Sequence, residues 1–150
     1  MQVDFYHLTR TPVERALPQI AEKVLASGVR LLVVSADAGQ RAAIDQQLWA
    51  YAPASFLPHG EAGGAFDAEQ PVLIADAVPE DGATANQAAH VALIDGQWRD
   101  AALHFARAFH FFDERAIAEA RTAWKALGAH AEVERRYWKQ DETGRWERAA

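Results

Sequence analysis

The run Leu31-Leu32-Val33-Val34, between Arg30 and Ser35, is apolar at every position and shows no alternation. A strand with one face in water would alternate between apolar and polar residues, whereas a strand covered on both faces is apolar throughout. A second run of this kind, Val72-Leu73-Ile74-Ala75, follows later in the chain. We therefore expect a sheet that is covered on both faces, which is typical of parallel strands in α/β proteins.

A helix is expected between the Leu31–Val34 run and an earlier strand at Gln2–Leu8. Thr11 is expected to cap it, with Pro12 in the first helical position and Glu14 completing a capping box. Gly28 is a suitable residue to end it. Strand, helix and strand in this order predict a βαβ unit with a right-handed crossover. Four apolar residues recur at helical spacing and would face the core: Val13, Leu17, Ile20 and Val24.

The rest of the chain continues to alternate between helical and strand patterns. Asp37, with Gln40 three residues on, is expected to begin a second helix, and a short helix is expected within 97–107. Together these patterns predict one domain over residues 1–150 with an α/β fold: a mostly parallel central sheet with helices on both faces, a Rossmann-like three-layer sandwich. The remaining expected elements are strands at His90–Ile94, Phe109–Phe112 and Val133–Lys139, and a helix that Asp113 begins and Gly128 ends.

Composition and charge exclude several classes of function. The chain has 150 residues, no cysteine and a net charge of −6, so disulfides and thiolate chemistry are excluded and a cytoplasmic location is expected. Residues 1–10 show no signal-peptide pattern, and no run approaches the about 18 apolar residues of a membrane span. Residues 36–98 hold nine acidic residues and one basic one, which disfavours strong direct binding to nucleic acid.

No catalytic or cofactor-binding pattern is present in the sequence. The strand-to-helix turns lack both the Gly-x-Gly-x-x-Gly spacing and the lysine loop that hold phosphates. The six histidines lack metal-ligand spacing, and no serine lies in a Gly-x-Ser-x-Gly turn. We therefore expect no catalytic residue, no metal and no cofactor. A small nucleotide-binding enzyme on the same fold remains the alternative, and a structural domain with all its aromatic residues in the core is a third.

Two groups of residues around large aromatic side chains stand out. The first leaves an expected helix at Trp49 and then places Phe56, Pro58 and His59 in a segment rich in proline and glycine, which we expect to be irregular. Large rings on a loop either anchor it to its own core or contact another protein, and both interpretations stay open here.

The second group lies on the expected helix that begins at Asp113. Arg121, Trp124 and Lys125 are spaced i, i+3 and i+4, so they share one helix face. This face could bind an acidic peptide with an aromatic end, its cations meeting the carboxylates. Alternatively, the indole belongs to the core and the two charges beside it are only solvated.

These residues carry a resemblance to a known family. Leu48-Trp49, followed after a short spacer by Ser55-Phe56-Leu57-Pro58-His59-Gly60, resembles the chi subunit of the bacterial DNA polymerase III clamp-loader assembly. The resemblance continues in order over nearly the whole chain, through Gln70-Pro71-Val72-Leu73-Ile74, Ala120-Arg121 with Trp124-Lys125, and Tyr137-Trp138.

The resemblance implies a DNA replication accessory subunit that is not an enzyme. Chi subunits link the acidic tail of single-stranded-DNA-binding protein, which ends in Pro-Phe, to the psi subunit of the clamp loader. By residue-to-residue correspondence, the tail would bind at Arg121, Trp124 and Lys125. Trp124 replaces a frequent tyrosine, and Ile117 stands near a lysine of some relatives, which makes the site less basic.

The resemblance also implies a second interaction surface. The psi subunit would dock at Trp49 and Phe56, with Pro58 and His59 beside them. Some chi relatives also dock a repair helicase through the same aromatic surface, so the two partners would compete for it.

Overall fold

The computed structural model describes residues 1–51 and 58–150. The eight strands of its sheet are β1 (Gln2–His7), β2 (Leu31–Val34), β3 (His59–Glu61), β4 (Val72–Ala75), β5 (His90–Leu93), β6 (Arg107–Phe112), β7 (Glu134–Gln140) and β8 (Trp146–Arg148). The helices are α1 (Val13–Ala26), α2 (Ala38–Ala50) and α3 (Ile117–Leu127). Three short 3-10 turns are η1 (Asp67–Glu69), η2 (Asp100–His104) and η3 (Glu114–Ala116).

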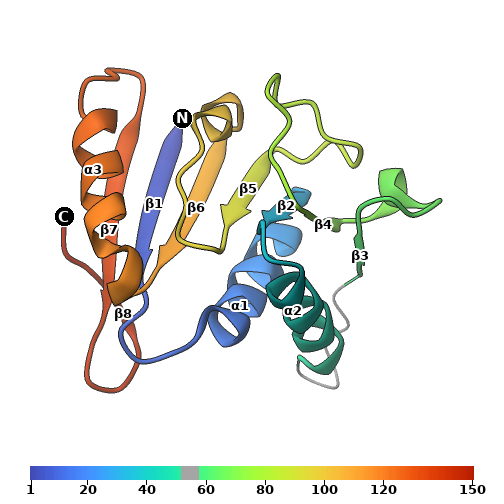
Figure 1. Ribbon diagram of the computed structural model, residues 1–150, viewed down its shortest axis with the longest axis horizontal. Coiled ribbons are helices and arrows are strands. Elements are labelled where there is room, and N and C mark those ends of the chain that lie inside the picture. The colour runs from blue at the N-terminus through green and yellow to red at the C-terminus, as the bar shows by residue number, and fades with distance from the viewer. Residues whose placement is uncertain (52–57) are drawn as a thin grey trace.

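The strands form one sheet in the order β3-β4-β2-β5-β6-β1-β7-β8 (Figure 1). Every neighbouring pair is parallel except the antiparallel pair β7–β8. The strand β2 lies between β4 and β5, in the interior of the sheet. This position explains its apolar sequence, since both of its faces are covered and all four of its residues are buried. The predicted mostly parallel α/β sheet is confirmed.

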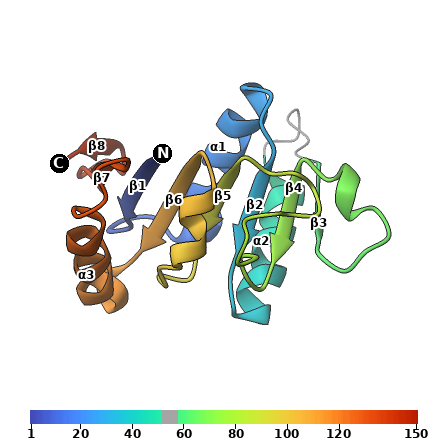
Figure 2. The same cartoon turned by 90° about the horizontal axis from the view of Figure 1, so that it is seen from above.

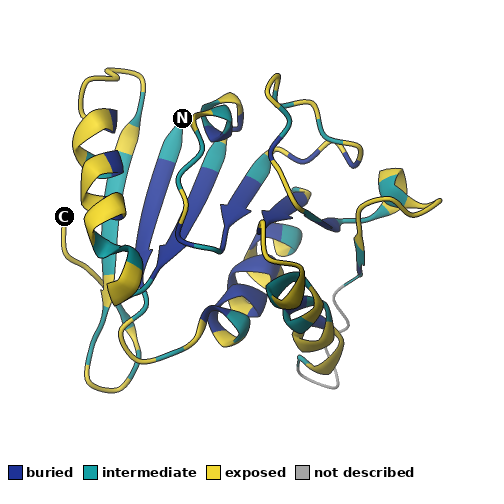
Figure 3. Cartoon of the chain, viewed as in Figure 1, coloured by how far each residue is buried: buried dark blue, intermediate teal, exposed yellow. Residues whose placement is uncertain are grey.

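Helical segments cover the two faces of the sheet, as Figure 2 shows from above. Leu31 and Val33 of β2 belong to a buried cluster with α1 and with Ile44 and Leu48 of α2. Leu32 and Val34, which point the opposite way, belong to a second cluster with η2 and α3. The buried residues of Figure 3 accordingly concentrate in the strands and on the inner sides of the helices. The predicted three-layer sandwich is therefore confirmed.

The beginning of α1 differs from the prediction. The cap residue is Pro12, without a side-chain cap bond, so the capping box expected from Thr11 and Glu14 is wrong. The reason lies far away in the sequence, because the Thr11 hydroxyl accepts a hydrogen bond of 2.7 Å from Gln140 Nε2. Gln140 Oε1 also accepts backbone N–H bonds from residues 9, 10 and 11 at 2.9–3.2 Å. This amide ties the β1–α1 loop to the end of β7.

Other local predictions were met in part. The Asp37 carboxylate accepts hydrogen bonds from Gly39 N and Gln40 N at 2.8 and 3.2 Å, so the predicted cap of α2 is confirmed. Asp113 caps the 3-10 turn η3 instead of an α-helix, and α3 begins only at Ile117. The segment expected to be irregular contains β3, a three-residue edge strand parallel to β4.

Candidate protein-binding surfaces

The helix α3 presents two cations on its outer side. Its buried residues Ala120, Ala123 and Leu127 pack on the sheet, and this leaves Arg121 and Lys125 exposed. Within residues 1–51 and 58–150, neither Arg121 nor Lys125 forms an ion pair with a carboxylate. The positive charge of both side chains is therefore available to a ligand.

The predicted third member of this site, Trp124, is half-buried between α3 and β7. Its ring meets Phe5 and Tyr137 edge to face, with centroids 5.3 and 5.7 Å away. The guanidinium of Arg135 lies over the ring, 4.4 Å from its centroid, and donates a hydrogen bond of 2.6 Å to the Trp124 carbonyl. The indole is thus part core residue and part surface, and its orientation is fixed.

Tyr137 joins the strand β7 to this group. Burial raises the pKa of the Tyr137 hydroxyl, while the nearby Arg121 acts to lower it and Glu114 to raise it. The Arg121 charge therefore acts on this strand, although the side chain belongs to α3. Together, Arg121, Trp124, Lys125, Arg135 and Tyr137 form what we call the α3–β7 site.

Sequence reasoning did not single out Arg135. A signal was present, because residues alternate between the two faces of a strand and Tyr137 lies two positions after Arg135. Once Tyr137 is assigned to the face that α3 covers, Arg135 must lie on that face as well. Without the sheet order, however, the partner of β7 on this face could not be known.

The second predicted surface lies at the end of α2. The Trp49 side chain is 59% exposed, and its ring contacts the His59 ring with centroids 4.9 Å apart. His59 itself is buried, with Nε2 at 3.1 Å from both the backbone and a carboxylate oxygen of Asp45. Pro58 is half-buried, and Phe56 lies outside the described residues. In this arrangement, His59 supports Trp49 from the inside.

The two surfaces lie at opposite edges of the sheet, as Figure 1 shows. The strand β3 and the adjacent end of α2 occupy one edge, while β7, β8 and α3 occupy the other. Five strands separate β3 from β7 in the sheet order. A protein bound at one surface would therefore leave the other surface open.

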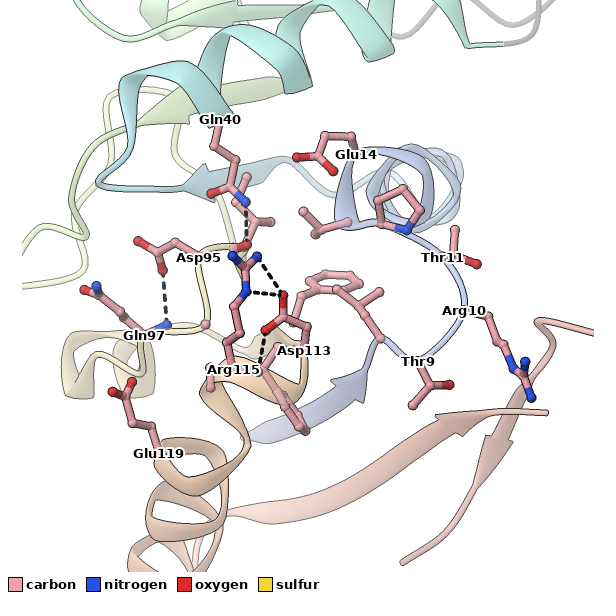
Figure 4. A pocket seen from close by; sticks show the side chains of 18 residues that line it. Thr9, Arg10, Thr11, Glu14, Gln40, Asp95, Gln97, Asp113, Arg115 and Glu119 are labelled. Carbon is pink, nitrogen blue, oxygen red and sulfur yellow. Dashed lines mark hydrogen bonds and ion pairs between the residues drawn. The ribbon is translucent and has the colours of Figure 1, made fainter. Parts of the chain in front are cut away.

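A cavity of about 570 Å³ opens where β1, β5 and β6 end (Figure 4). Ligands of Rossmann-like folds bind at such strand ends, so this cavity tests the nucleotide-binding alternative. Its lining includes four carboxylates. The carboxylates of Asp95 and Asp113 are paired with Arg99 and Arg115 at 2.8 and 3.1 Å. Among the described residues, Arg10 is then the one cation of the lining without an ion pair, against four carboxylates. The four acidic residues are Glu14, Asp95, Asp113 and Glu119.

Residues 1–51 and 58–150 contain neither a metal-binding cluster nor a membrane-spanning helix. Within them, no group of three or more His, Cys, Asp or Glu side chains could hold a metal ion. In the same ranges, no helix combines the length and the apolar character that crossing a bilayer requires.

Comparisons with known proteins agree with the resemblance noted above. A family model described as "DNA polymerase III chi subunit, HolC" matches residues 1–133. A probable DNA polymerase III subunit chi from Rickettsia prowazekii (strain Madrid E) is 28% identical over 75 residues, which span 50% of this chain and 46% of that protein. The C-terminal domain of a SWI2/SNF2 ATPase from Sulfolobus solfataricus aligns with a TM-score of 0.46 at 10% identity, over 79% of this chain and 56% of that one. The last similarity is too low to support an inference.

Proposed function

Because this chain belongs to the family of the DNA polymerase III chi subunit, we propose that it is an adaptor with two protein-binding surfaces. Chi is a non-catalytic accessory subunit of DNA polymerase III, so the role of the family is in DNA replication and not in turnover of a metabolite. The acidic lining of the strand-end cavity also speaks against the nucleotide-binding alternative.

The first surface in this proposal is the α3–β7 site. It would bind the acidic C-terminal tail of single-stranded-DNA-binding protein. The exposed cations of Arg121 and Lys125 suit the carboxylates of such a tail, and the half-buried Trp124 offers an apolar floor for its terminal aromatic ring. The tail protein would hold the DNA, so this chain needs no strong nucleic-acid contact of its own.

The second surface consists of Trp49, Phe56, Pro58 and His59. It would dock the psi subunit of the clamp loader, or a repair helicase in competition with psi. An indole that is 59% exposed loses much of its contact with water when a partner covers it, which is typical of the central residues of protein interfaces. We place this assembly in the cytoplasm, as expected of replication proteins.

The observation that carries the proposal is the placement of the two surfaces at opposite edges of one sheet. An adaptor must hold both partners at once. The five strands that separate the β3 edge from the β7 edge support this requirement.

The test is simultaneous binding to the immobilised chain. An acidic peptide that ends in Asp-Ile-Pro-Phe is added first, at saturation, and the psi protein is added next. We expect psi to bind with the same affinity whether or not the peptide is present. Displacement of the peptide by psi would show that both use one surface, and absence of peptide binding would refute the first half of the proposal.

A further inference from the structure

We propose that Arg135 is a third cation of the α3–β7 site, fixed before the ligand arrives, and that it receives a carboxylate of the acidic peptide. This inference rests on the proposed function, and it adds a residue of β7 to a site expected on α3 alone.

The first argument is the way in which the guanidinium is held. Arg135 Nη1 donates to the Trp124 carbonyl at 2.6 Å, and the guanidinium carbon lies 4.4 Å from the centroid of the Trp124 ring. A guanidinium carries five N–H donors in one plane. With one donor committed to the carbonyl, the others along the edge of the plane remain available for two-point binding of a carboxylate.

The end of α3 explains why this geometry is possible. Gly128 N donates to the Lys125 carbonyl at 3.1 Å, so the Trp124 carbonyl is left to the arginine. A Cβ at residue 128 would lie 3.2 Å from Arg135 Nη1 and 3.1 Å from the Lys125 carbonyl oxygen, so glycine makes room for the guanidinium. An arginine at the last carbonyls of a helix is also favoured by the helix dipole. Arg135 thus caps α3, and little conformational entropy remains to be lost on binding.

The second argument is charge. Across the described part of the chain, Arg135 forms no ion pair with a carboxylate. Its neighbour Arg136 points to the opposite face of β7 and is paired with Glu134 at 2.8 Å. Among the described residues, the α3–β7 site thus has three cations without an ion pair, Arg121, Lys125 and Arg135, of which Arg135 lies over the Trp124 ring. They repel one another until an anionic ligand neutralises them, which favours a peptide that carries several carboxylates.

The experiment measures binding of the acidic peptide ending in Asp-Ile-Pro-Phe by calorimetry. We expect Arg135→Gln to weaken binding about tenfold, the effect of losing one charge-assisted hydrogen bond at a half-buried position. Arg135→Lys keeps the charge without the planar fork, so its affinity for the peptide should lie between those of Arg135→Gln and the unaltered chain. The matched control is Arg136→Gln, which should bind like the unaltered chain. Circular dichroism and the thermal midpoint verify that α3 is intact in each variant.

Two altered peptides identify the carboxylate. One has an amidated C-terminus and the other has asparagine in place of its last aspartate. For the peptide that lacks the carboxylate bound by Arg135, the Arg135→Gln substitution should cause no further loss, because the contact is already absent. The salt dependence of binding should also decrease in this variant, since one cation is missing.

Other outcomes would overturn the inference. If Arg121→Ala weakens binding and Arg135→Gln does not, Arg135 receives no carboxylate of the peptide while the proposed function stands. If Arg135→Gln weakens all three peptides equally and leaves the salt dependence unchanged, Arg135 only positions Trp124 and binds no carboxylate. If the unaltered chain binds no peptide, the proposed tail site fails and the inference fails with it.

Discussion

Each of the two proposed surfaces contains one tryptophan, and the two indoles are presented in opposite ways. Trp49 stands 59% exposed at the end of α2, with the buried His59 beneath it. Trp124 is half-buried, with Phe5 and Tyr137 at its edges and a guanidinium over one face. An exposed ring stabilises a complex through the apolar area that the partner covers, whereas a fixed ring among cations provides selectivity for an acidic ligand. The same residue type therefore suits two different kinds of partner.

The largest difference is expected from Trp49→Ala. We expect a loss of about 2–4 kcal/mol in the binding of psi, the usual range for a central interface tryptophan. Binding of the acidic peptide should stay unchanged, because α3 lies at the other edge. Surface plasmon resonance with both ligands on one preparation measures this contrast. Equal loss of both activities would mean that the substitution damages the fold.

Acid should abolish the difference between the two surfaces, because both depend on the same folded sheet. His110 of β6 is fully buried, and burial lowers the pKa of its imidazole from 6.5 to about 4. Asp95 acts to raise this pKa and Arg99 to lower it further. Between pH 6.5 and 4, His110 therefore binds a proton in the unfolded chain but not in the folded chain. The free energy of unfolding should fall across this interval by roughly 3 kcal/mol, and this group should contribute no further loss below pH 4.

The measurement is urea unfolding at pH 7 and at pH 4.5. His110→Phe keeps a ring among Phe5, Trp98 and Phe112 and removes the titrating group, so its stability should decrease less on acidification. An identical decrease in both proteins would assign the acid sensitivity to other residues.

At the β7 edge, Arg121→Ala should weaken the acidic peptide by about 1.5–3 kcal/mol, the contribution of a hydrogen bond to a charged group. Psi binding should be unaffected. Thr122→Ala, next to Arg121 and also exposed, is a suitable control for helix α3. Calorimetry that shows full affinity for the Arg121 variant would remove this arginine from the site.

The smallest effect should come from salt. Raising the ionic strength from about 0.05 to about 0.5 M should weaken peptide binding several-fold, because the exposed cations of the α3–β7 site are screened. Binding at Trp49 should change less, since it depends on apolar burial. Parallel titrations of both ligands test this, and a steeper salt dependence for psi would reverse the assignment of the two surfaces.

The fold could be predicted to the extent that its signals are local. The run Leu31–Val34 predicted a doubly covered strand because burial on both faces requires an apolar residue at every position. The strand β3 gave no such signal, since His59–Glu61 is three residues long and only His59 is buried. The cap at Thr11 was predicted wrongly because its competitor, Gln140, is 129 residues away.

The candidate site followed the same pattern. Helical spacing placed Arg121, Trp124 and Lys125 on one face of α3, where the structure has them. The depth of Trp124 and its contact with Arg135 depend on which strand lies under the helix, and no short-range pattern determines this. Whether these residues bind a peptide stays a prediction.

The hydrogen bonds between Gln140 and the β1–α1 loop have a practical consequence for anyone who shortens this protein. The family model ends at residue 133, and a version trimmed there would lack β7 and β8. It would leave β1 as an exposed edge strand, and the unpaired backbone groups along this strand favour self-association. It would also lose the hydrogen bond of 2.9 Å that the Trp138 indole donates to the carboxylate of Asp4. The β7–β8 hairpin therefore joins the C-terminal part of the chain to the N-terminal strand β1, and a shortened version should retain it.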